Sequence, residues 1–364
     1  MSTSPASSPD QEPSVSALEP LGGWPALFAD LTDGQDLSRP RAEAAMTEIL
    51  AGQASPVQIA ALLIGLRAKG ETVDELTGFV TAMLDASERL EVPDAAIDIV
   101  GTGGSDHRRR HALNVSTMAS IVAASAGAVV CKHGNRRASS TSGSFDFLDA
   151  LGVAIELDPR QLQACVEEID LGFAFARAYH PAMRFAGPVR VELGIPTVFN
   201  TLGPLANPAR VVRQVVGVSS PERARLVAEV LVATGSQSAM VVAGDGGLDE
   251  LSTTGDSIAV IAEPSGVREQ AVRPSELGIE EVTLDRLVGG TAGENVAIFT
   301  GILAGDRSPY RDIVLLNAAA GLVVAGVAAD LPAGLTAAAA AVDDGAAGAK
   351  LDALRTVSNR LAGS

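Results

Sequence analysis

The chain has 364 residues, of which 47% are apolar, and a formal net charge of −17 at pH 7. This length allows one large domain with a smaller one beside it and a substantial buried core. The acidic excess argues against a general nucleic-acid-binding protein, because such proteins gain affinity from a basic face that neutralises phosphates.

The cysteine content and the apolar stretches indicate the cellular compartment that we expect for the protein. Cys131 and Cys165 are the only cysteines and form no CxxC pair, so neither a zinc site nor a disulfide framework is indicated. No stretch reaches the roughly 20 consecutive apolar residues that a membrane-spanning helix needs. We therefore expect a reduced, cytoplasmic setting without a membrane partner.

The first quarter of the chain divides into a polar tail and a helical segment. Residues 1–22 are rich in Ser, Pro and acidic residues, which predicts a disordered tail. Residues 23–93 show helical periodicity without any strand signal, with a helix start at Ser55-Pro56 and a capping box at Thr72 and Glu75. We predict a small all-helical domain over 23–93, to which a helical stretch near 165–195 could be joined.

From residue 94 to 364, strand-like and helix-like segments alternate. The predicted strands cover residues 96–100, 128–131, 172–176, 211–218, 239–243 and 257–262. The predicted helices cover residues 116–126, 144–151, 161–169, 181–193 and 220–234, and most of the last hundred residues. This alternation predicts a large α/β domain with a central, mostly parallel sheet flanked by helices.

Three Gly- or hydroxyl-rich elements follow strands or open helices in this second part. Gly101-Thr102-Gly103-Gly104 follows the first strand, and Asn114-Val115-Ser116-Thr117 opens the next helix. The stretch 132–144 follows a strand and combines cationic side chains, hydroxyls and glycines. Each could be an ordinary turn, cap or solvated loop, but together they favour a ligand with two separated phosphate groups.

Two more patterns could carry chemistry. Asp249-Glu250 follows a strand and a Gly-rich turn; the pair could hold Mg²⁺, a cation that prefers oxygen ligands, or be an exposed acidic pair. His180 and Arg190 bracket a predicted helix, and Arg190 could bind a carboxylate or form a surface salt bridge. The Gly- and Pro-containing stretch 194–204 is expected to form structural turns.

Taken together, these elements resemble the anthranilate phosphoribosyltransferases, a family with a nucleoside-phosphorylase-like fold. The resemblance covers about residues 24–330 and rests on five motifs in order. They are 101–104, 114–117, 132–135 with Ser139-Ser140, 198–208, and Leu248-Asp249-Glu250.

The resemblance implies Mg²⁺-dependent transfer of phosphoribosyl from 5-phosphoribosyl 1-pyrophosphate to anthranilate in tryptophan biosynthesis. Pyrophosphate is released, and the enzyme is expected to be a homodimer formed through the helical domain. Stabilising the leaving pyrophosphate and holding the amine over C1 would be the main catalytic tasks. The amine is already a nucleophile, so no residue is assigned as a catalytic acid or base.

The resemblance also implies roles for individual residues. The donor site would include Gly101, Gly104, Asp106, Asn114, Ser116, Thr117, Lys132, Asn135, Ser139, Ser140 and Ser144. The anthranilate site would include Gly101, His133, Asn135, His180 and Arg190. The Mg²⁺ ligands would be Ser116, Asp249 and Glu250.

One loop departs from the family pattern. Ser105 stands where the family has Asp after the two glycines, Asp106 comes one place later, and Ala112 replaces an expected Thr. The span to Asn114 is about three residues longer and contains His107-Arg108-Arg109-Arg110-His111. Asp106 could take over the role of the missing Asp and the arginines could contact phosphate, or the loop could change the donor affinity or the acceptor.

Three other functions therefore remain open at the level of the sequence. A nucleoside phosphorylase of the same fold would cleave pyrimidine nucleosides with phosphate, and a related phosphoribosyltransferase would act on another aromatic amine. A non-catalytic relative that binds nucleic acid is the third, against which the net charge of −17 argues. The adjacent acidic pair and the 132–140 loop favour a pyrophosphorylated donor over a nucleoside.

Overall fold

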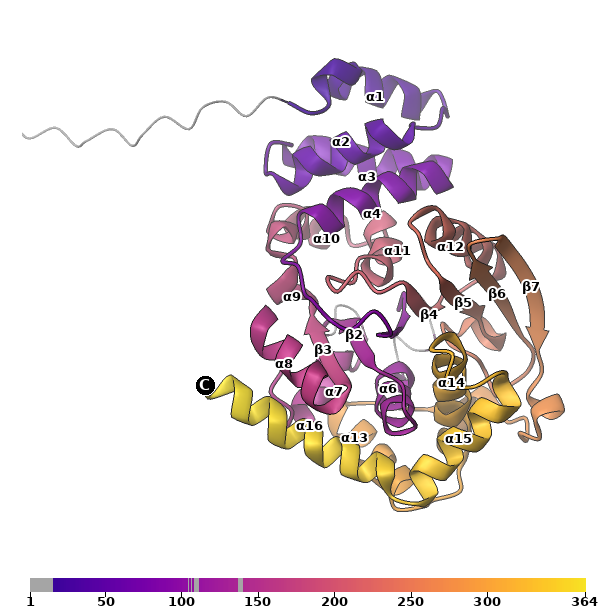
Figure 1. Ribbon diagram of the computed structural model, residues 1–364. Helices are drawn as coiled ribbons and strands as arrows, with labels where there is room; N and C mark the ends of the chain where they lie inside the picture. Colours follow the sequence, from indigo (N-terminus) through magenta and orange to yellow (C-terminus); the bar gives the residue numbers. More distant parts are fainter. Residues whose placement is uncertain (1–15, 104, 106, 108–110, 137–139) are drawn as a thin grey trace, which may run out of the picture.

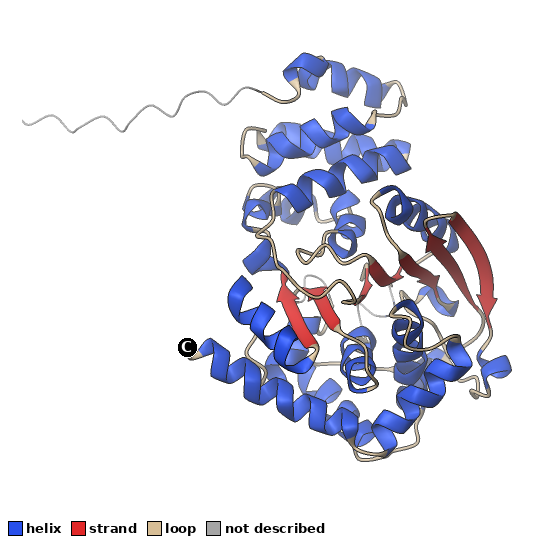
Figure 2. Cartoon of the chain, viewed as in Figure 1, coloured by secondary structure: helices blue, strands red, loops and turns tan. Residues whose placement is uncertain are grey.

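The computed structural model describes residues 16–103, 105, 107, 111–136 and 140–364. A helical bundle lies at one end of the molecule, the C-terminal helices lie at the other, and the strands run between them (Figures 1 and 2). The bundle contains α1 (Gly23–Thr32), α2 (Arg39–Leu50), α3 (Pro56–Lys69) and α4 (Val73–Asp85). No helix in the described ranges is both long and apolar enough to cross a membrane.

The bundle helices begin where the sequence predicts. The Ser55 hydroxyl accepts a hydrogen bond from the Gln58 backbone N–H at the start of α3, and Thr72 does the same for Glu75 at the start of α4. Both capping boxes satisfy N–H groups that would lack partners in the first helical turn. The two predicted helix starts are confirmed.

The predicted disordered tail is too long at its C-terminal end. Residues 1–15 lie outside the described part of the chain, but residues 16–22 pack against the bundle. Leu18 is completely buried, and its N–H donates to the carboxylate of Glu48, which also accepts a hydrogen bond from the Trp24 ring N–H. A short 3-10 turn, Glu19–Leu21, leads into α1. Burial of one apolar residue and a buried acceptor therefore order this segment.

The second part of the chain alternates strands and helices as expected. Its strands are β1 (Asp98–Gly101), β2 (Val130–Gly134), β3 (Leu171–Phe175), β4 (Arg213–Gly217), β5 (Ser238–Ala243), β6 (Ser257–Glu263) and β7 (Gly266–Val272). The helices up to β5 are α6 (Val115–Ser125), α7 (Ser144–Ala150), α8 (Pro159–Ile169), α9 (Ala176–Tyr179), α10 (Gly187–Leu193), α11 (Val198–Leu205) and α12 (Pro221–Ala233). The C-terminal helices are α13 (Ala292–Leu303), α14 (Pro309–Val324), α15 (Leu331–Asp343) and α16 (Ala346–Ala362).

The strands form a five-stranded sheet in the order β1-β4-β5-β6-β7 and a separate pair, β2-β3. Strands β1, β4 and β5 run parallel to one another, as do β2 and β3. Strand β6 pairs antiparallel with β5, and β7 pairs antiparallel with β6. A single parallel bridge between Ile97 and Val130 joins the pair to the larger sheet. The predicted fold class, a helical bundle plus an α/β part with a mostly parallel sheet, is confirmed.

Three local predictions are wrong. Strand β2 does not end at Cys131 but continues through Lys132 and His133 to Gly134, because these residues pair with β3. The predicted helix over 181–193 is a 3-10 turn, Pro181–Arg184, followed by the separate helix α10. The stretch 194–204, expected to form turns, contains most of α11, and Pro204 lies inside this helix, one residue before its end. Strand β7 has no counterpart among the predicted strands.

The bundle shares an apolar core with one face of the sheet, and the other face of the sheet packs on a second apolar core. Alternate residues of β4 and β5 face opposite sides of the sheet: Val216 and Val241 join the core of the bundle, while Val215 and Met240 join the core beneath the C-terminal helices. Helix α10 packs against α3, and α11 packs against both α3 and α4. Helix α12 packs against both α4 and the strands β5 and β6, so the bundle rests on one face of the sheet chiefly through α12.

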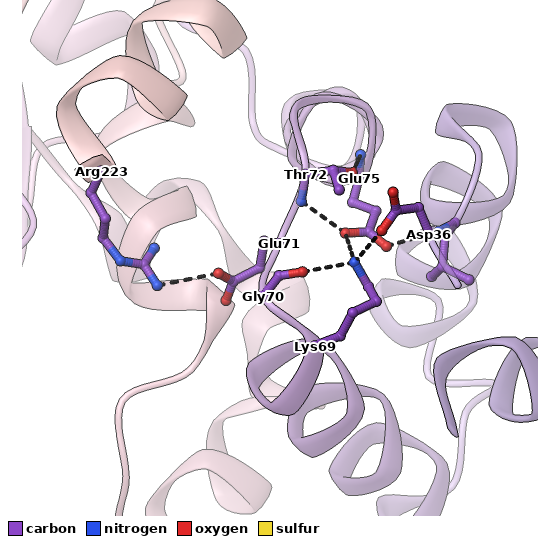
Figure 3. A network of polar contacts seen from close by, with 8 residues as sticks. Asp36, Lys69, Gly70, Glu71, Thr72, Glu75 and Arg223 are labelled. Atoms are coloured by element: carbon purple, nitrogen blue, oxygen red, sulfur yellow. Dashed lines mark hydrogen bonds and ion pairs between the residues drawn. The ribbon is translucent and has the colours of Figure 1, made fainter. Parts of the chain in front are cut away.

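Polar contacts add to this junction (Figure 3). The Lys69 ammonium at the end of α3 binds the buried carboxylate of Glu75 and that of Asp36, and the surrounding carboxylates raise the pKa of Lys69 despite the opposing effect of burial. The next residues along the chain bring Glu71 to Arg223 of α12, 3.2 Å away. The Arg223 guanidinium also donates to the Thr201 hydroxyl on α11. Arg223 thus links the bundle, α11 and α12.

Candidate active site

The carboxyl ends of β1, β4 and β5 are closed by glycines, and the segment Leu248–Glu250 lies against them. A Cβ atom on Gly217 would come within 1.7 Å of the Asp249 carbonyl oxygen, and one on Gly101 within 2.5 Å of the Asp249 carboxylate. A Cβ on Gly244 would come within 2.3 Å of the Glu250 carbonyl oxygen. Only glycine permits this close approach, so the three glycines set the position of the acidic pair.

The first cavity, of about 290 Å³, opens at this edge of the sheet. The predicted site residues that line it are Gly101, Asn114, Ser116, Lys132, His133, Asn135, Ser140, Ser144, Asp249 and Glu250. The structure therefore brings together residues from the loop after β1, the start of α6, β2 and the loop before β6. Thr117 is completely buried within α6. Gly104, Asp106 and Ser139, also predicted, lie outside the described residues.

Two hydrogen bonds tie the start of α6 to the loop after β2. The Ser142 hydroxyl donates to the Asn114 side-chain oxygen at 2.9 Å, and the Ala112 N–H donates to the Thr141 hydroxyl at 3.1 Å. Helix α6 has 11 residues, so its N-terminus carries the positive end of a helix dipole, and Asn114 and Ser116 at this end line the cavity. The two elements form a single wall that is suited to anionic oxygens.

Lys132 lies at the floor of this cavity and is almost completely buried. Its ammonium donates to the Ile99 carbonyl oxygen on β1 at 2.6 Å. Burial lowers the pKa of Lys132, and the nearby carboxylates of Asp98 and Asp249 oppose that shift. Burial also raises the pKa of Asp98 to about 6, against the opposing effect of Lys132 and of a hydrogen bond from Asn207. The charge of Lys132 is therefore held by two carboxylates at the base of the site.

The second cavity, of about 550 Å³, shares His133 and Asn135 with the first. Its apolar lining comes from Met83, Pro181, Met183 and Phe199, and its charged lining comes from Arg177, Arg184 and Arg190. The predicted His180 and Arg190 are both part of this wall.

Arg190 is held without a carboxylate partner. Its guanidinium lies over the ring of Phe199, 5.1 Å from the ring centre, and burial lowers its pKa. Among the described residues no ion pair joins Arg190 to an acidic side chain. A buried, oriented guanidinium of this kind is a strong binding group for a planar carboxylate.

His133 lines both cavities, and His180 lines the second, with the centres of the two rings 5.2 Å apart. Burial, with a smaller effect from His180, lowers the pKa of His133 to about 3, and burial also lowers the pKa of His180. His133 Nδ1 donates to the Gly203 carbonyl oxygen at 3.1 Å, because a carbonyl can only accept. Its Nε2 is therefore an acceptor, and it has no hydrogen-bond partner among the described residues.

The oxygen ligands around Asp249 fit a hard cation such as Mg²⁺. Ser116, Asp249 and Glu250 all line the first cavity and supply only oxygen atoms. One oxygen of Asp249 accepts the Gly103 N–H at 2.7 Å, which fixes the carboxylate in place. No cluster of three or more His, Cys, Asp or Glu side chains exists in the described part of the chain. Phosphate oxygens of a substrate would thus have to complete the coordination, as is usual for Mg²⁺.

Several lining residues are absent from the predicted set. Asn200 lines the first cavity, and Met83, Phe199, Arg177 and Arg184 line the second. Asn200 and Phe199 belong to the 198–208 motif, so the motif itself was a signal that the interpretation as turns overlooked. Met83 lies near the end of a bundle helix and carries no such signal.

The helical bundle beside an α/β part is the two-part architecture of a glycosyl transferase family. Residues 25–87 match the family described as "Glycosyl transferase family, helical bundle domain", and residues 93–348 match "Glycosyl transferase family, a/b domain". The chain belongs to the anthranilate phosphoribosyltransferase branch of this family, as the following relatives show.

Curated relatives with that name match almost from end to end. The chain is 46% identical over 363 residues to the anthranilate phosphoribosyltransferase of Rhodococcus opacus, covering 98% of this chain and 99% of the relative. It is 47% identical over 334 residues to that of Beijerinckia indica, covering 92% and 97%.

Solved structures agree. The anthranilate phosphoribosyltransferase of Thermus thermophilus superimposes with a TM-score of 0.85 at 40% identity, covering 91% of this chain and 99% of that one. The Saccharomyces cerevisiae enzyme, solved in complex with PRPP and Mg, gives a TM-score of 0.83 at 27% identity, with coverage of 93% and 98%. The same yeast enzyme in complex with 4-fluoroanthranilate gives 0.82 at 26% identity, with the same coverage.

Proposed function

We propose that this protein transfers the phosphoribosyl group from 5-phosphoribosyl 1-pyrophosphate to anthranilate, with Mg²⁺, in tryptophan biosynthesis. The observation that carries this proposal is the pair of cavities that meet at His133 and Asn135. One cavity is suited to phosphates and a cation, and the other to an aromatic carboxylate. A bond between ligands in the two cavities would form where they meet.

The first cavity is proposed as the donor site. The start of α6 and the loop after β2 would bind the anionic oxygens through Asn114, Ser116, Ser140 and Ser144, with Lys132 supplying positive charge from below. Gly101 and Asn135 line the same cavity. The complex of the yeast relative with PRPP and Mg supports this assignment at the level of the family.

The second cavity is proposed as the acceptor site. Arg190 would bind the anthranilate carboxylate, and the apolar wall that includes Phe199 would hold the ring, with His180 behind His133. The neutral His133 presents an acceptor nitrogen that could take a hydrogen bond from the amine. The yeast relative in complex with 4-fluoroanthranilate is consistent with such a ligand.

In the reaction, the amine nitrogen forms a bond to C1 of the ribose while the bond from C1 to the pyrophosphate oxygen breaks. The electron pair of that bond leaves with pyrophosphate, and the amine gives up one proton. Ser116, Asp249 and Glu250 would hold Mg²⁺, which when bound neutralises charge on pyrophosphate. The chain itself would orient the amine over C1 and place the positive end of the α6 dipole, with Asn114 and Ser116, beside the leaving oxygens.

We further propose that residues 23–93 and 94–364 are the two domains and that the protein is a cytoplasmic homodimer. The support for a dimer is an unusual set of exposed apolar side chains on adjoining helices of the bundle side. These are Val57 and Ile64 on α3, Val191 on α10, and Ile195 just after it. Exposed apolar groups of this kind commonly mark an interface between protein chains. Sedimentation equilibrium of the wild type and of Val191→Asp would test it, because a dissociated variant is expected.

The test of the activity is the Mg²⁺- and donor-dependent loss of anthranilate fluorescence. We expect turnover with anthranilate and none when either the donor or Mg²⁺ is omitted. Turnover of uridine or thymidine with phosphate, without loss of anthranilate, would favour the nucleoside phosphorylase instead. A panel of other aromatic amines in the same assay would reveal a different acceptor.

A further inference from the structure

Two fully or almost fully buried asparagines of the C-terminal helices contact the backbone of the first cavity from behind. Asn295 lies on α13, which packs against α7, and Asn317 lies on α14, which packs against β4 and β5 (Figure 1). Neither belongs to a sequence motif described above, and neither lines a cavity. Each nevertheless forms hydrogen bonds with a segment that carries proposed donor-site residues.

Asn295 forms hydrogen bonds with the backbone at the point where the loop 105–112 meets the start of α6. Its side-chain oxygen accepts the Asn114 N–H at 2.9 Å, and its amide nitrogen donates to the Ala112 carbonyl oxygen at 2.9 Å. The Gly290 N–H donates to the same Ala112 oxygen at 2.8 Å. A Cβ on Gly289 would lie 1.9 Å from that oxygen, so the segment that contacts Ala112 also needs a glycine at position 289. The loop that differs from the family pattern therefore returns to a fixed point immediately before α6.

Asn317 holds the residue next to the acidic pair in the same manner. Its side-chain oxygen accepts the Leu251 N–H at 3.0 Å, and its amide nitrogen donates to the Leu251 carbonyl oxygen at 2.9 Å. Leu251 is completely buried and directly follows Glu250. The amide nitrogen also donates to the Ile313 carbonyl oxygen of its own helix at 2.9 Å, which fixes the rotamer.

The orientation of both amides follows from their partners. A backbone N–H can only donate and a carbonyl can only accept. The side-chain oxygen of each asparagine must therefore lie against the N–H, and its side-chain nitrogen against the carbonyl oxygen. No other uncharged side chain of this size offers both groups, and a buried N–H or carbonyl left without a partner is costly. Each asparagine is thus matched to the segment it holds.

We propose that Asn295 and Asn317 are positioning residues for the two halves of the donor site. Asn295 sets the phosphate-binding start of α6, and Asn317 sets the Asp249-Glu250 pair that would hold the cation. The inference rests on the proposed donor site, because its residues define what the two asparagines position. It adds a separation of roles: one asparagine governs binding of the donor, and the other governs binding of the metal ion.

The test compares Asn295→Ala with Asn317→Ala, each serving as the matched control for the other. Donor binding is measured by titration calorimetry at saturating Mg²⁺, and metal binding is measured with Mn²⁺ by electron paramagnetic resonance at a saturating donor concentration. We expect Asn295→Ala to raise the donor Kd about tenfold or more with a change in Mn²⁺ affinity of less than about threefold. Asn317→Ala is expected to give the reverse pattern.

Other outcomes separate the possible failures. Equal losses of donor and metal binding in both variants, in step with their melting temperatures, would mean general packing and would overturn the proposal. Unchanged binding in both variants, while Asp249→Ala with Glu250→Ala abolishes Mn²⁺ binding, would overturn it and leave the proposed function intact. A wild-type protein that binds no donor would instead refute the proposed function. If an alanine variant does not fold, Asn→Asp at the same position keeps the volume and the acceptor but sets a carboxylate against a carbonyl.

Discussion

Replacement of Gly217 by Ala should displace the acidic pair while leaving both of its side chains unchanged. Gly217 ends β4 with ordinary backbone angles, so alanine is not strained there, and the whole effect comes from its Cβ. That atom would lie 1.7 Å from the Asp249 carbonyl oxygen and 2.4 Å from its carbonyl carbon, whereas real Cβ contacts stay beyond 3.0 Å. The contact is with backbone, so no rotamer can relieve it, and Asp249 must move by roughly 1 Å or more.

A displacement of about 1 Å in a catalytic group can cost about 100-fold in rate, or about 2.7 kcal/mol of transition-state stabilisation. We expect Gly217→Ala to lower kcat/KM by about this factor and to raise the Mg²⁺ concentration needed for half-maximal rate, both followed by anthranilate fluorescence. Gly348→Ala is the matched control, because that glycine lies in α16 with nothing within 4 Å of an added Cβ and also has ordinary backbone angles. A Gly217→Ala enzyme with wild-type kcat/KM and wild-type Mg²⁺ dependence would refute the reasoning.

Three further predictions concern the charged groups of the site. Asp249→Ala with Glu250→Ala should remove the Mg²⁺ dependence and most activity; full activity in this variant would show the pair to be a surface feature. Arg190→Ala should raise the anthranilate KM at least tenfold while the donor KM changes little, since the anthranilate carboxylate would lose the guanidinium proposed to bind it. His133 has a folded-state pKa of about 3, below its unfolded value of 6.5, so its contribution to stability is present above pH 6.5 and is lost as pH falls towards 3. Denaturant unfolding at pH 7.5 and pH 5 should therefore show wild type losing ~2 kcal/mol more than His133→Gln, and equal losses would contradict the neutral, buried assignment.

The local order of the chain was accessible from the sequence, because capping and periodicity act over short distances. The capping boxes of α3 and α4 are formed by residues three apart, and the structure has both. The extension of β2 to Gly134 could not be read in this way. Lys132 and His133 look like loop residues, and only their pairing with Phe173 and Ala174 makes them part of a strand.

The same limit applies to the site. The glycines 101–104 and the pair at 249–250 each suggest a ligand, but no local pattern reveals that one glycine of another strand, Gly217, sets the height of Asp249. Asn295 is farther still, since it is 181 positions from the residue whose N–H it accepts. The sequence around a buried asparagine in an apolar helix does not show whether its side chain forms hydrogen bonds with a distant segment or with its own helix.

Contacts from residues far away in the sequence also hold the end of the loop 105–112, which differs from the family pattern. The extra residues and Ala112 would be expected to shift the start of α6, because the loop leads directly into it. In the structure the Ala112 carbonyl oxygen is held by Asn295 and Gly290, and its N–H is held by Thr141. None of these contacts uses the side chain at position 112, so the replacement of Thr by Ala leaves them intact. The consequence is that Ala112→Thr should change donor affinity far less than Asn295→Ala, measured by the same calorimetric titration; a larger effect of Ala112→Thr would place control of α6 in the loop side chain.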